Sequence, residues 1–109
     1  LMAWRISMIK EQDSLLRLEI ILSQSIEDDF ITAFLSCDTG HMFTKLDHVM
    51  GQGFSTPKMG DSIWPQLNSM YVVYCTQEQI GPIKEIIDSL RKEYPGEGVA
   101  CFLSEAKVL

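Results

Sequence analysis

The stretch from Gly51 to Pro65 limits the fold of this chain more than any other. It reads Gly-Gln-Gly-Phe-Ser-Thr-Pro-Lys-Met-Gly-Asp-Ser-Ile-Trp-Pro. Glycine costs backbone entropy in a helix or strand and proline removes a backbone donor, so this stretch is a loop that divides the chain. It also holds Phe54 and Trp64, large apolar groups that a disordered linker usually lacks. Because long loops are uncommon in compact domains and are often functional, we expect a functional loop here.

Before this loop, the pattern predicts a strand, a helix and a second strand. Residues 15–22 alternate so that one face is wholly apolar, with Leu16, Leu18, Ile20 and Leu22. Ser25 is the expected N-cap of a helix, because acidic residues follow in the first turn and apolar residues recur at helical spacing as far as Cys37. A turn is expected at Asp38–Gly40. Residues 42–50 mix strand formers with charged side chains, which favours an edge strand.

After the loop, the pattern predicts a strand, a helix and a last strand. The run 67–75 is rich in β-branched and aromatic residues, so we expect it to be central in its sheet. Thr76 and Gln79 resemble a capping box, and apolar residues recur at three and four residue spacing to about Tyr94. Residues 99–104 alternate as a strand. The order β-α-β-β-α-β predicts an α+β, ferredoxin-like fold, with a four-stranded antiparallel sheet and two helices on one face.

Such a fold leaves the second face of the sheet without a helical cover. The 67–75 strand is nevertheless apolar on both faces, with Tyr71 and Val73 on one and Val72 on the other. In a monomer the uncovered face would be a large apolar patch, and such patches mark interfaces. We therefore expect an oligomer.

Charge and composition argue against several classes of partner. Nine basic residues against fifteen acidic ones give a net charge of -6, which repels nucleic-acid phosphate, so no nucleic-acid partner is expected. Three widely spaced cysteines argue against a disulfide framework and favour the reducing cytoplasm. No apolar run approaches the length of a membrane span, so no membrane insertion is expected. We expect residues 1–14 to be an N-terminal extension or an expression remnant, and 15–109 to be the folded domain.

With this order of elements, two short motifs resemble the PII-type signalling proteins. Gly51-x-Gly53 opens the long connection between the second and third strands, as in the T-loop of that family. Gly96-Glu97-Gly98 lies between the second helix and the last strand, as in the family's nucleotide-contacting B-loop. The resemblance spans about residues 15–109 and is that of a divergent PII-like protein, within the nitrogen regulatory PII superfamily. The chain departs from the family in a shorter T-loop without tyrosine, and in Val99, where the family has a basic residue.

The resemblance implies a trimer that binds a nucleotide in the cleft between subunits. In the family the base of the T-loop and the B-loop hold the nucleotide, which points here to Gly51, Gln52, Gly53, Gly96, Glu97 and Gly98.

The residues of the loop add three candidates to this set. Backbone amides freed by the glycines, as far as Phe54, form a potential anion-binding concavity. Lys58 is the only cation of the loop, and its alternative role is that of a solvated side chain. Trp64 is a candidate stacking platform for an aromatic ligand, or else it packs the end of the loop onto the domain. We therefore expect a homotrimeric sensor of a small anionic metabolite, an adenine nucleotide being one candidate, whose 51–65 loop contacts a target protein.

Neither enzyme activity nor a resident metal is expected. The sequence has no obvious Ser/His/Asp or Cys/His arrangement, and Cys75 and Cys101 fall in apolar strands, where a free thiol is usually inert. Gly51-x-Gly53 is not followed by the Gly-Lys-Ser/Thr of a phosphate-binding loop. Two alternatives share much of the expected fold. One is a metal-handling trimer of the divalent-cation-tolerance type, and the other is a dimeric amino-acid-sensing module of the ACT type.

Overall fold

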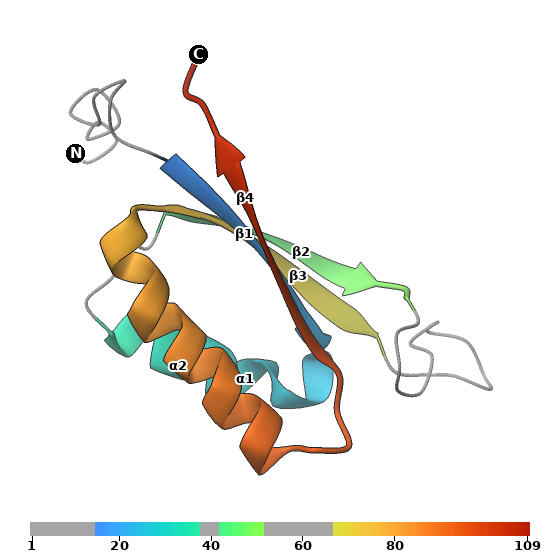
Figure 1. The fold of residues 1–109 in the computed structure, drawn as a ribbon. Helices are drawn as coiled ribbons and strands as arrows, with labels where there is room; N and C mark the ends of the chain where they lie inside the picture. The colour runs from blue at the N-terminus through green and yellow to red at the C-terminus, as the bar shows by residue number, and fades with distance from the viewer. Residues whose placement is uncertain (1–14, 38–41, 52–66) are drawn as a thin grey trace.

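The computed structural model of the chain describes residues 15–37, 42–51 and 67–109 (Figure 1). Its elements follow one another as β1 (Leu15–Ser23), the 3-10 turn η2 (Gln24–Ile26), α1 (Glu27–Ser36), β2 (Phe43–Val49), β3 (Asn68–Cys75), α2 (Gln77–Glu93) and β4 (Val99–Ala106). The predicted β-α-β-β-α-β order is confirmed. The turn expected at Asp38–Gly40, most of the long loop and residues 1–14 lie outside the described residues.

The four strands form one antiparallel sheet in the order β2-β3-β1-β4. β3 and β1 are the inner strands, which confirms the central place predicted for the 67–75 strand, and β2 is an edge strand, as its charged residues indicated. Both helices lie on the same side of the sheet (Figure 1). The fold is therefore the predicted ferredoxin-like one, with two layers.

The core lies between the sheet and the two helices. Alternate residues of the inner strands face the helices and are buried, namely Leu16, Leu18, Ile20 and Leu22 of β1 and Tyr71, Val73 and Cys75 of β3. α1 contributes Phe30, whose ring centroid lies 4.9 Å from that of Tyr71 and 5.5 Å from that of Phe34. α2 contributes Ile83, Ile87 and Leu90 at helical spacing. These are the apolar periodicities of the sequence, and each one buries its predicted face.

The start of α1 differs from the prediction. Ser25 is not its N-cap, because β1 continues to Ser23 and the chain first makes the 3-10 turn η2. Ser23 caps that turn by accepting a hydrogen bond from the backbone N–H of Ser25 at 3.3 Å. In α2 the expected cap is present, since the backbone N–H of Thr76 donates to Oε1 of Gln79 at 2.9 Å. The described part of the chain contains no helix long and apolar enough to cross a membrane.

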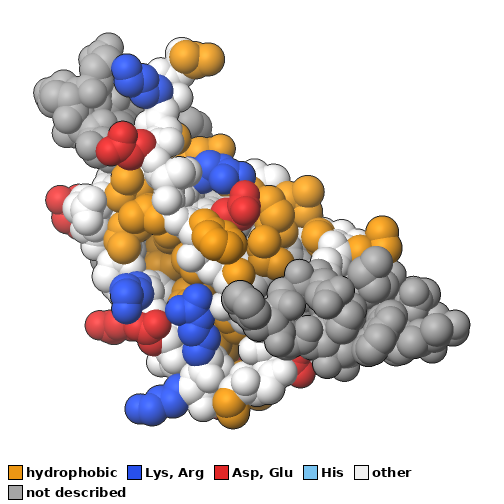
Figure 2. All heavy atoms as spheres, turned by 45° about the vertical axis from the view of Figure 1, so that its right-hand side comes forward, with side chains coloured by type: hydrophobic (Ala, Val, Ile, Leu, Met, Phe, Trp, Pro, Cys, Tyr) orange, Lys and Arg blue, Asp and Glu red, His pale blue; other side chains and the backbone are white. Residues whose placement is uncertain are grey.

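The sheet face turned away from the helices is mostly apolar, but its inner strand β1 carries the ion pair of Arg17 and Glu19, 3.1 Å apart. We call this face the open face, and its members are Thr44 and Leu46 of β2, Met70, Val72 and Tyr74 of β3, Leu15, Arg17, Glu19 and Ile21 of β1, and Ala100, Phe102, Ser104 and Ala106 of β4. Phe102 is 60% exposed and Leu46 is 45% exposed. A space-filling view shows hydrophobic side chains gathered over the middle of the molecule (Figure 2). No helix of the described residues covers this face, as the sequence led us to expect.

The inner position of β3 yields a prediction for stability. Val73 is only 1% exposed and faces the helices, so Val73→Asp would bury a carboxylate without a partner and lower the free energy of unfolding by roughly 2–5 kcal/mol. Thr32→Asp, on the exposed side of α1 and away from the sheet, is the matched control and should change stability little. Urea denaturation of both variants measures the difference. Equal stability of the two variants would contradict the place of β3 in the core.

Candidate functional site

Four of the nine predicted ligand-binding residues lie in the described part of the chain. Gly51 follows β2, and Gly96, Glu97 and Gly98 form the connection from α2 to β4. The other five, Gln52, Gly53, Phe54, Lys58 and Trp64, lie outside the described residues, so their proposed roles stay predictions.

The two described segments lie at the same end of the sheet. Val49, near the end of β2, pairs with Asn68 of β3, and Asn68 also lies opposite Ser23 at the end of β1. Leu22 in turn lies opposite Val99, the first residue of β4. Gly51 and Gly98 therefore extend beyond the sheet in the same direction, and Figure 1 shows the end of β2 and the α2–β4 connection on the same side of the molecule.

The same segments lie at opposite edges of that sheet. β2 and β4 are its two outer strands, so three interstrand spacings, or about 14 Å, separate them. One chain therefore does not bring Gly51 into contact with the Gly96–Gly98 turn. Contact between two such segments requires neighbouring copies of the chain.

The glycines leave open space around the backbone. Among the described residues, a Cβ added to Gly96 would meet no atom within 4 Å, and one added to Gly51 would meet Nδ2 of Asn68 at 3.4 Å. Neither glycine has a φ in the left-handed region, so the backbone itself does not demand glycine at these two positions. The space beside Gly96 is open, so another molecule can approach the backbone of the turn there.

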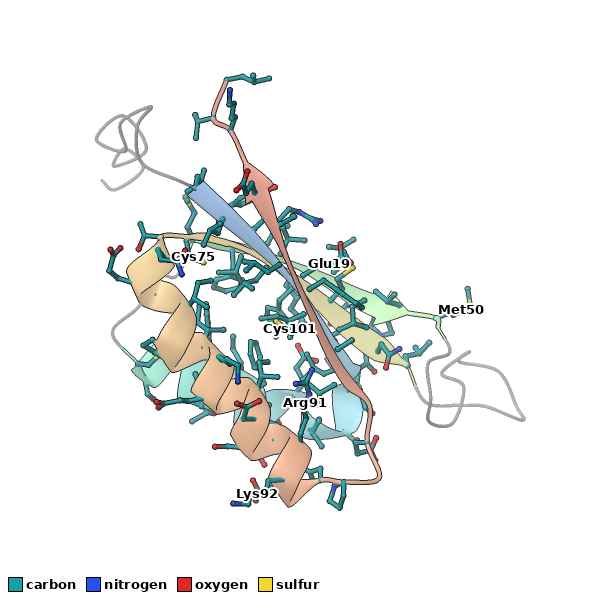
Figure 3. The ribbon with its side chains drawn as sticks, in the orientation of Figure 1. Glu19, Met50, Cys75, Arg91, Lys92 and Cys101 are labelled. Atoms are coloured by element: carbon teal, nitrogen blue, oxygen red, sulfur yellow. The ribbon has the colours of Figure 1, made fainter. Side chains whose placement is uncertain are left out.

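The Gly96–Gly98 turn is held by the end of α2. The backbone N–H of Glu97 donates to the carbonyl of Tyr94 at 3.0 Å, and the N–H of Tyr94 donates to Leu90 at 2.9 Å. Nε of Arg91 donates to the carbonyl of Val99 at 3.1 Å. This bond places a guanidinium beside the turn, while Lys92 follows it in the same helical turn (Figure 3).

Arg91 is a candidate site residue that the sequence reasoning missed. The resemblance to PII-type proteins pointed to a basic residue at position 99, directly after the glycines, but this chain has valine there. Arg91 precedes Val99 by eight residues, and only the return of β4 along α2 brings the two together. The available signal was Arg91–Lys92 itself, the one adjacent basic pair in the sequence.

A polar cluster lies under the same end of the sheet. We call it the Glu27 cluster, and its members are Glu27, Lys45, Asp47, Ser69 and Tyr71. Glu27 is 8% exposed, and its carboxylate accepts from three donors: Oγ of Ser69 at 2.7 Å, the hydroxyl of Tyr71 at 2.5 Å and Nζ of Lys45 at 2.5 Å. Lys45 also pairs with Asp47 at 3.1 Å. The first residue of α1 is thereby joined to both β2 and β3.

These contacts favour a negatively charged Glu27, a positively charged Lys45 and a protonated Tyr71 hydroxyl. Burial alone would raise the pKa of the Glu27 carboxyl, but the hydrogen bonds from Lys45, Tyr71 and Ser69 together leave this pKa below its ordinary value of 4.5. Hydrogen bonds to Glu27 and then Asp47 raise the pKa of Lys45. Burial, followed by the Glu27 hydrogen bond, raises the pKa of Tyr71, so its hydroxyl remains a donor. The cluster thus holds two anions around one ammonium, and its geometry joins strands to a helix.

The Glu27 cluster was not predicted. The sequence assigned Glu27 only to the first turn of a helix and Lys45 only to an exposed edge strand. The available signal was the polarity of Lys45, Asp47 and Ser69 at positions that alternate with outward-facing residues. Such inward polar residues need partners, and Glu27 is the partner that the fold supplies.

The cysteines and histidine of the described residues form no metal cluster. No group of three His, Cys, Asp or Glu residues that could hold a metal occurs among residues 15–37, 42–51 and 67–109. Cys75 and Cys101 are free thiols. Burial raises the pKa of Cys75 to about 11, so this thiol stays protonated at neutral pH.

The sequence matches no family model and no curated protein. Among solved structures, the chain is similar to CPII bound to ADP and bicarbonate, from Thiomonas intermedia K12, with a TM-score of 0.68, 18% identity, and coverage of 87% of this chain and 88% of that one. A second structure of CPII, a nitrogen regulatory PII-like protein, bound to ADP, AMP and bicarbonate, gives a TM-score of 0.66 at 17% identity, over 87% and 92% of the two chains. A candidate PII-like signaling protein from Thermus thermophilus gives 0.59 at 15% identity, over 89% and 91%. The fold is therefore that of PII-like proteins.

The Glu27 cluster predicts a pH dependence of stability. The folded-state pKa of Glu27 lies below the unfolded value of 4.5, so its stabilisation is complete above about pH 4.5 and is lost as pH falls through the folded pKa. Glu27→Gln keeps the shape but loses the charge, and should lower the free energy of unfolding by about 1–3 kcal/mol at neutral pH. The loss should shrink in acid. Urea denaturation between about pH 7 and about pH 3.5 tests this, with Asp28→Asn as the matched control. An equal loss at every pH would contradict the assignment.

Proposed function

Taking the PII-like fold as the premise, we propose that this chain is a PII-like regulatory protein that binds an adenine nucleotide between neighbouring subunits. The observation that carries the proposal is the placement of Gly51 and the Gly96–Gly98 turn at one end of the sheet but at opposite edges. Each chain then contributes one half of a site at its β2 edge and the other half of a second site at its β4 edge. The CPII structures with this fold contain ADP and bicarbonate, which are anions of the chemistry that such amides and cations bind.

In this proposal the turn and Arg91 bind the anionic part of the nucleotide. Gly96 and Gly98 are exposed, Glu97 is half-buried, and the Nε of Arg91 beside them donates to the carbonyl of Val99. That bond orients the planar guanidinium, whose Nη1 also lies 3.8 Å from Oδ1 of Asp88. A phosphate or carboxylate would therefore bind the terminal N–H groups in competition with this long ion pair. Because the chain carries a net charge of -6, a local cation is needed to hold an anion here.

The neighbouring subunit supplies the other half of the proposed site. Its Gly51, Gln52, Gly53 and Phe54 would add backbone amides, Lys58 a second cation and Trp64 a surface for the adenine ring. Ordering of the 51–65 loop around the ligand would then be the signal that a target protein reads, in the cytoplasm. The loss of backbone freedom on ordering such a loop is large, so ligand contacts and loop order are expected to form together.

A homotrimer is the assembly that we propose for this site. The open face needs a cover, and its exposed Leu46 and Phe102 are the side chains that a neighbour would bury. A dimer would favour the ACT-like alternative. Thermal shifts with divalent cations in place of nucleotides would favour the metal-handling alternative.

The assembly predicts a mass. Light scattering coupled to gel filtration should give about three times the chain mass of 12.4 kDa. Phe102→Glu places a charge on the open face opposite Glu19 and should dissociate the assembly. Leu35→Glu is the matched control, because Leu35 is also exposed but lies on α1, away from the sheet. A stable monomer of the unaltered protein at micromolar concentration would refute the proposed assembly.

The site predicts which cation matters for binding. Arg91→Ala should weaken ADP binding by about tenfold or more in calorimetric titration, because one charge-assisted contact is lost. Lys107→Ala removes an exposed cation just beyond the other end of β4, away from the turn, and should leave ADP affinity unchanged. The thermal unfolding midpoints of both variants show how much the lost hydrogen bond from Arg91 to Val99 contributes to stability. Equal ADP affinity of the two variants would remove Arg91 from the site, and failure of the unaltered protein to bind ADP would refute the proposed ligand.

A further inference from the structure

The first turn of α1 carries three acidic residues with different surroundings. Glu27, Asp28 and Asp29 follow one another, and all three favour the positive end of the helix dipole. Glu27 and Asp29 also contact residues far away in the sequence, while Asp28 is exposed and makes no hydrogen bond or ion pair with the described residues. Favourable interaction with the helix dipole applies to all three residues, so it does not explain why only Glu27 and Asp29 have distant partners.

Glu27 supports the end of β2. Its carboxylate binds Nζ of Lys45. Oγ of Ser69, with one proton to donate, lies 2.7 Å from Glu27 and 3.3 Å from Asp47. The β2–β3 register shifts directly afterwards, between Leu46 and Val49.

This register shift makes side-chain support important. His48 has a φ of 58° there, in a region that non-glycine residues rarely adopt. Ladder hydrogen bonds are interrupted at such a shift, so side chains that hold the strand just before it decide the direction in which the chain reaches Gly51. The Glu27 cluster contains those side chains.

Asp29 supports the other segment. Its carboxylate accepts a hydrogen bond from the hydroxyl of Tyr94, the C-cap of α2. The carbonyl of Tyr94 in turn accepts the bond from the N–H of Glu97 that closes the turn. The pKa of Tyr94 is raised to about 12, first by its hydrogen bond to Asp29, so the hydroxyl remains a donor at neutral pH. Asp29 therefore holds the residue on which the Gly96–Gly98 turn is built.

We propose that Glu27 and Asp29 are positioning residues, through which one helical turn sets the placement of both glycine segments relative to each other. Glu27 acts through Lys45 and Ser69 on the β2 end, and Asp29 acts through Tyr94 on the turn. The two carboxylates are two residues apart on one rigid element, so a displacement of α1 would move both halves of the site. The part of this proposal that concerns the nucleotide rests on the proposed function, and the part that concerns the two segments does not.

The test compares three variants that each remove one negative charge from the same helical turn. Glu27→Gln and Asp29→Asn remove the two supporting carboxylates, and Asp28→Asn is their control. Amide hydrogen exchange of the ligand-free protein is the first measurement. We expect faster exchange in 43–51 for Glu27→Gln and in 94–99 for Asp29→Asn, with neither change in Asp28→Asn. Unchanged exchange in both segments, or an equal increase throughout the protein, would overturn the proposal.

Smaller changes at the other ends of the same contacts guard against a variant that fails to fold. Tyr94→Phe removes only the hydroxyl that Asp29 accepts from, and Lys45→Met keeps most of the apolar stem while removing the ammonium. Each should reproduce the local exchange pattern of its carboxylate partner. Combining Tyr94→Phe with Asp29→Asn should add nothing to the exchange in 94–99, because both remove one contact. Full additivity would overturn the assignment of Asp29.

ADP affinity, measured by calorimetry, is the second measurement and tests the link to the site. Glu27→Gln and Asp29→Asn should each weaken ADP binding by about fivefold or more, with Asp28→Asn equal to the unaltered protein. Equal affinity in all variants, despite the local change in exchange, would overturn the positioning role toward the ligand. If the unaltered protein binds no ADP, the proposed function fails, and hydrogen exchange still decides whether α1 supports the two segments.

Discussion

Two helices have to bury one whole face of a four-stranded sheet, and most of the structure follows from this requirement. The inner strands meet it with alternate large apolar residues. Phe30 of α1 packs against Tyr71 of β3 and stacks on Phe34 of its own helix. The edge strands meet it only in part, since β2 is exposed along most of its length. The same geometry leaves the open face without a helix. A chain of this size therefore places its stable core on one side of the sheet and leaves a largely apolar face on the other.

The Glu27 carboxylate is the polar exception within this apolar layer. Removing a carboxylate from water is unfavourable by several kcal/mol unless hydrogen bonds replace the lost solvation, and three donors do so here. These hydrogen bonds also join α1 to the strands β2 and β3. β2 has a neighbouring strand on one side only, and Lys45 gives it a second attachment, to α1. The strand that leads into the long loop is thereby held from two directions.

The sequence was sufficient for the fold, because its signals are local. Alternation in 15–22 and helical spacing up to Leu90 identify faces without knowledge of their partners, and each predicted face is buried. The N-cap at Ser25 was wrong because an extra 3-10 turn of three residues, Gln24–Ile26, cannot be distinguished by pattern from the first turn of a helix. The contacts of the site are of another kind. Lys45 meets Glu27, and Arg91 meets Val99, only through strand register and chain return, which no local pattern contains. The glycine segments could be named from sequence, but their separation across the sheet could not.

The irregular end of β2 also affects how the protein avoids aggregation. An edge strand presents unpaired backbone groups to any passing strand, which can extend the sheet from molecule to molecule. Along β2, the charged Lys45 and Asp47 face the helix layer, and the register shift near His48 interrupts the ladder. A strand added from another molecule would have to desolvate those charges. It would also have to match the irregular backbone of β2 at the register shift. Fibre-like growth at this edge is therefore disfavoured, although the same sheet exposes apolar side chains such as Leu46 and Phe102 on its open face.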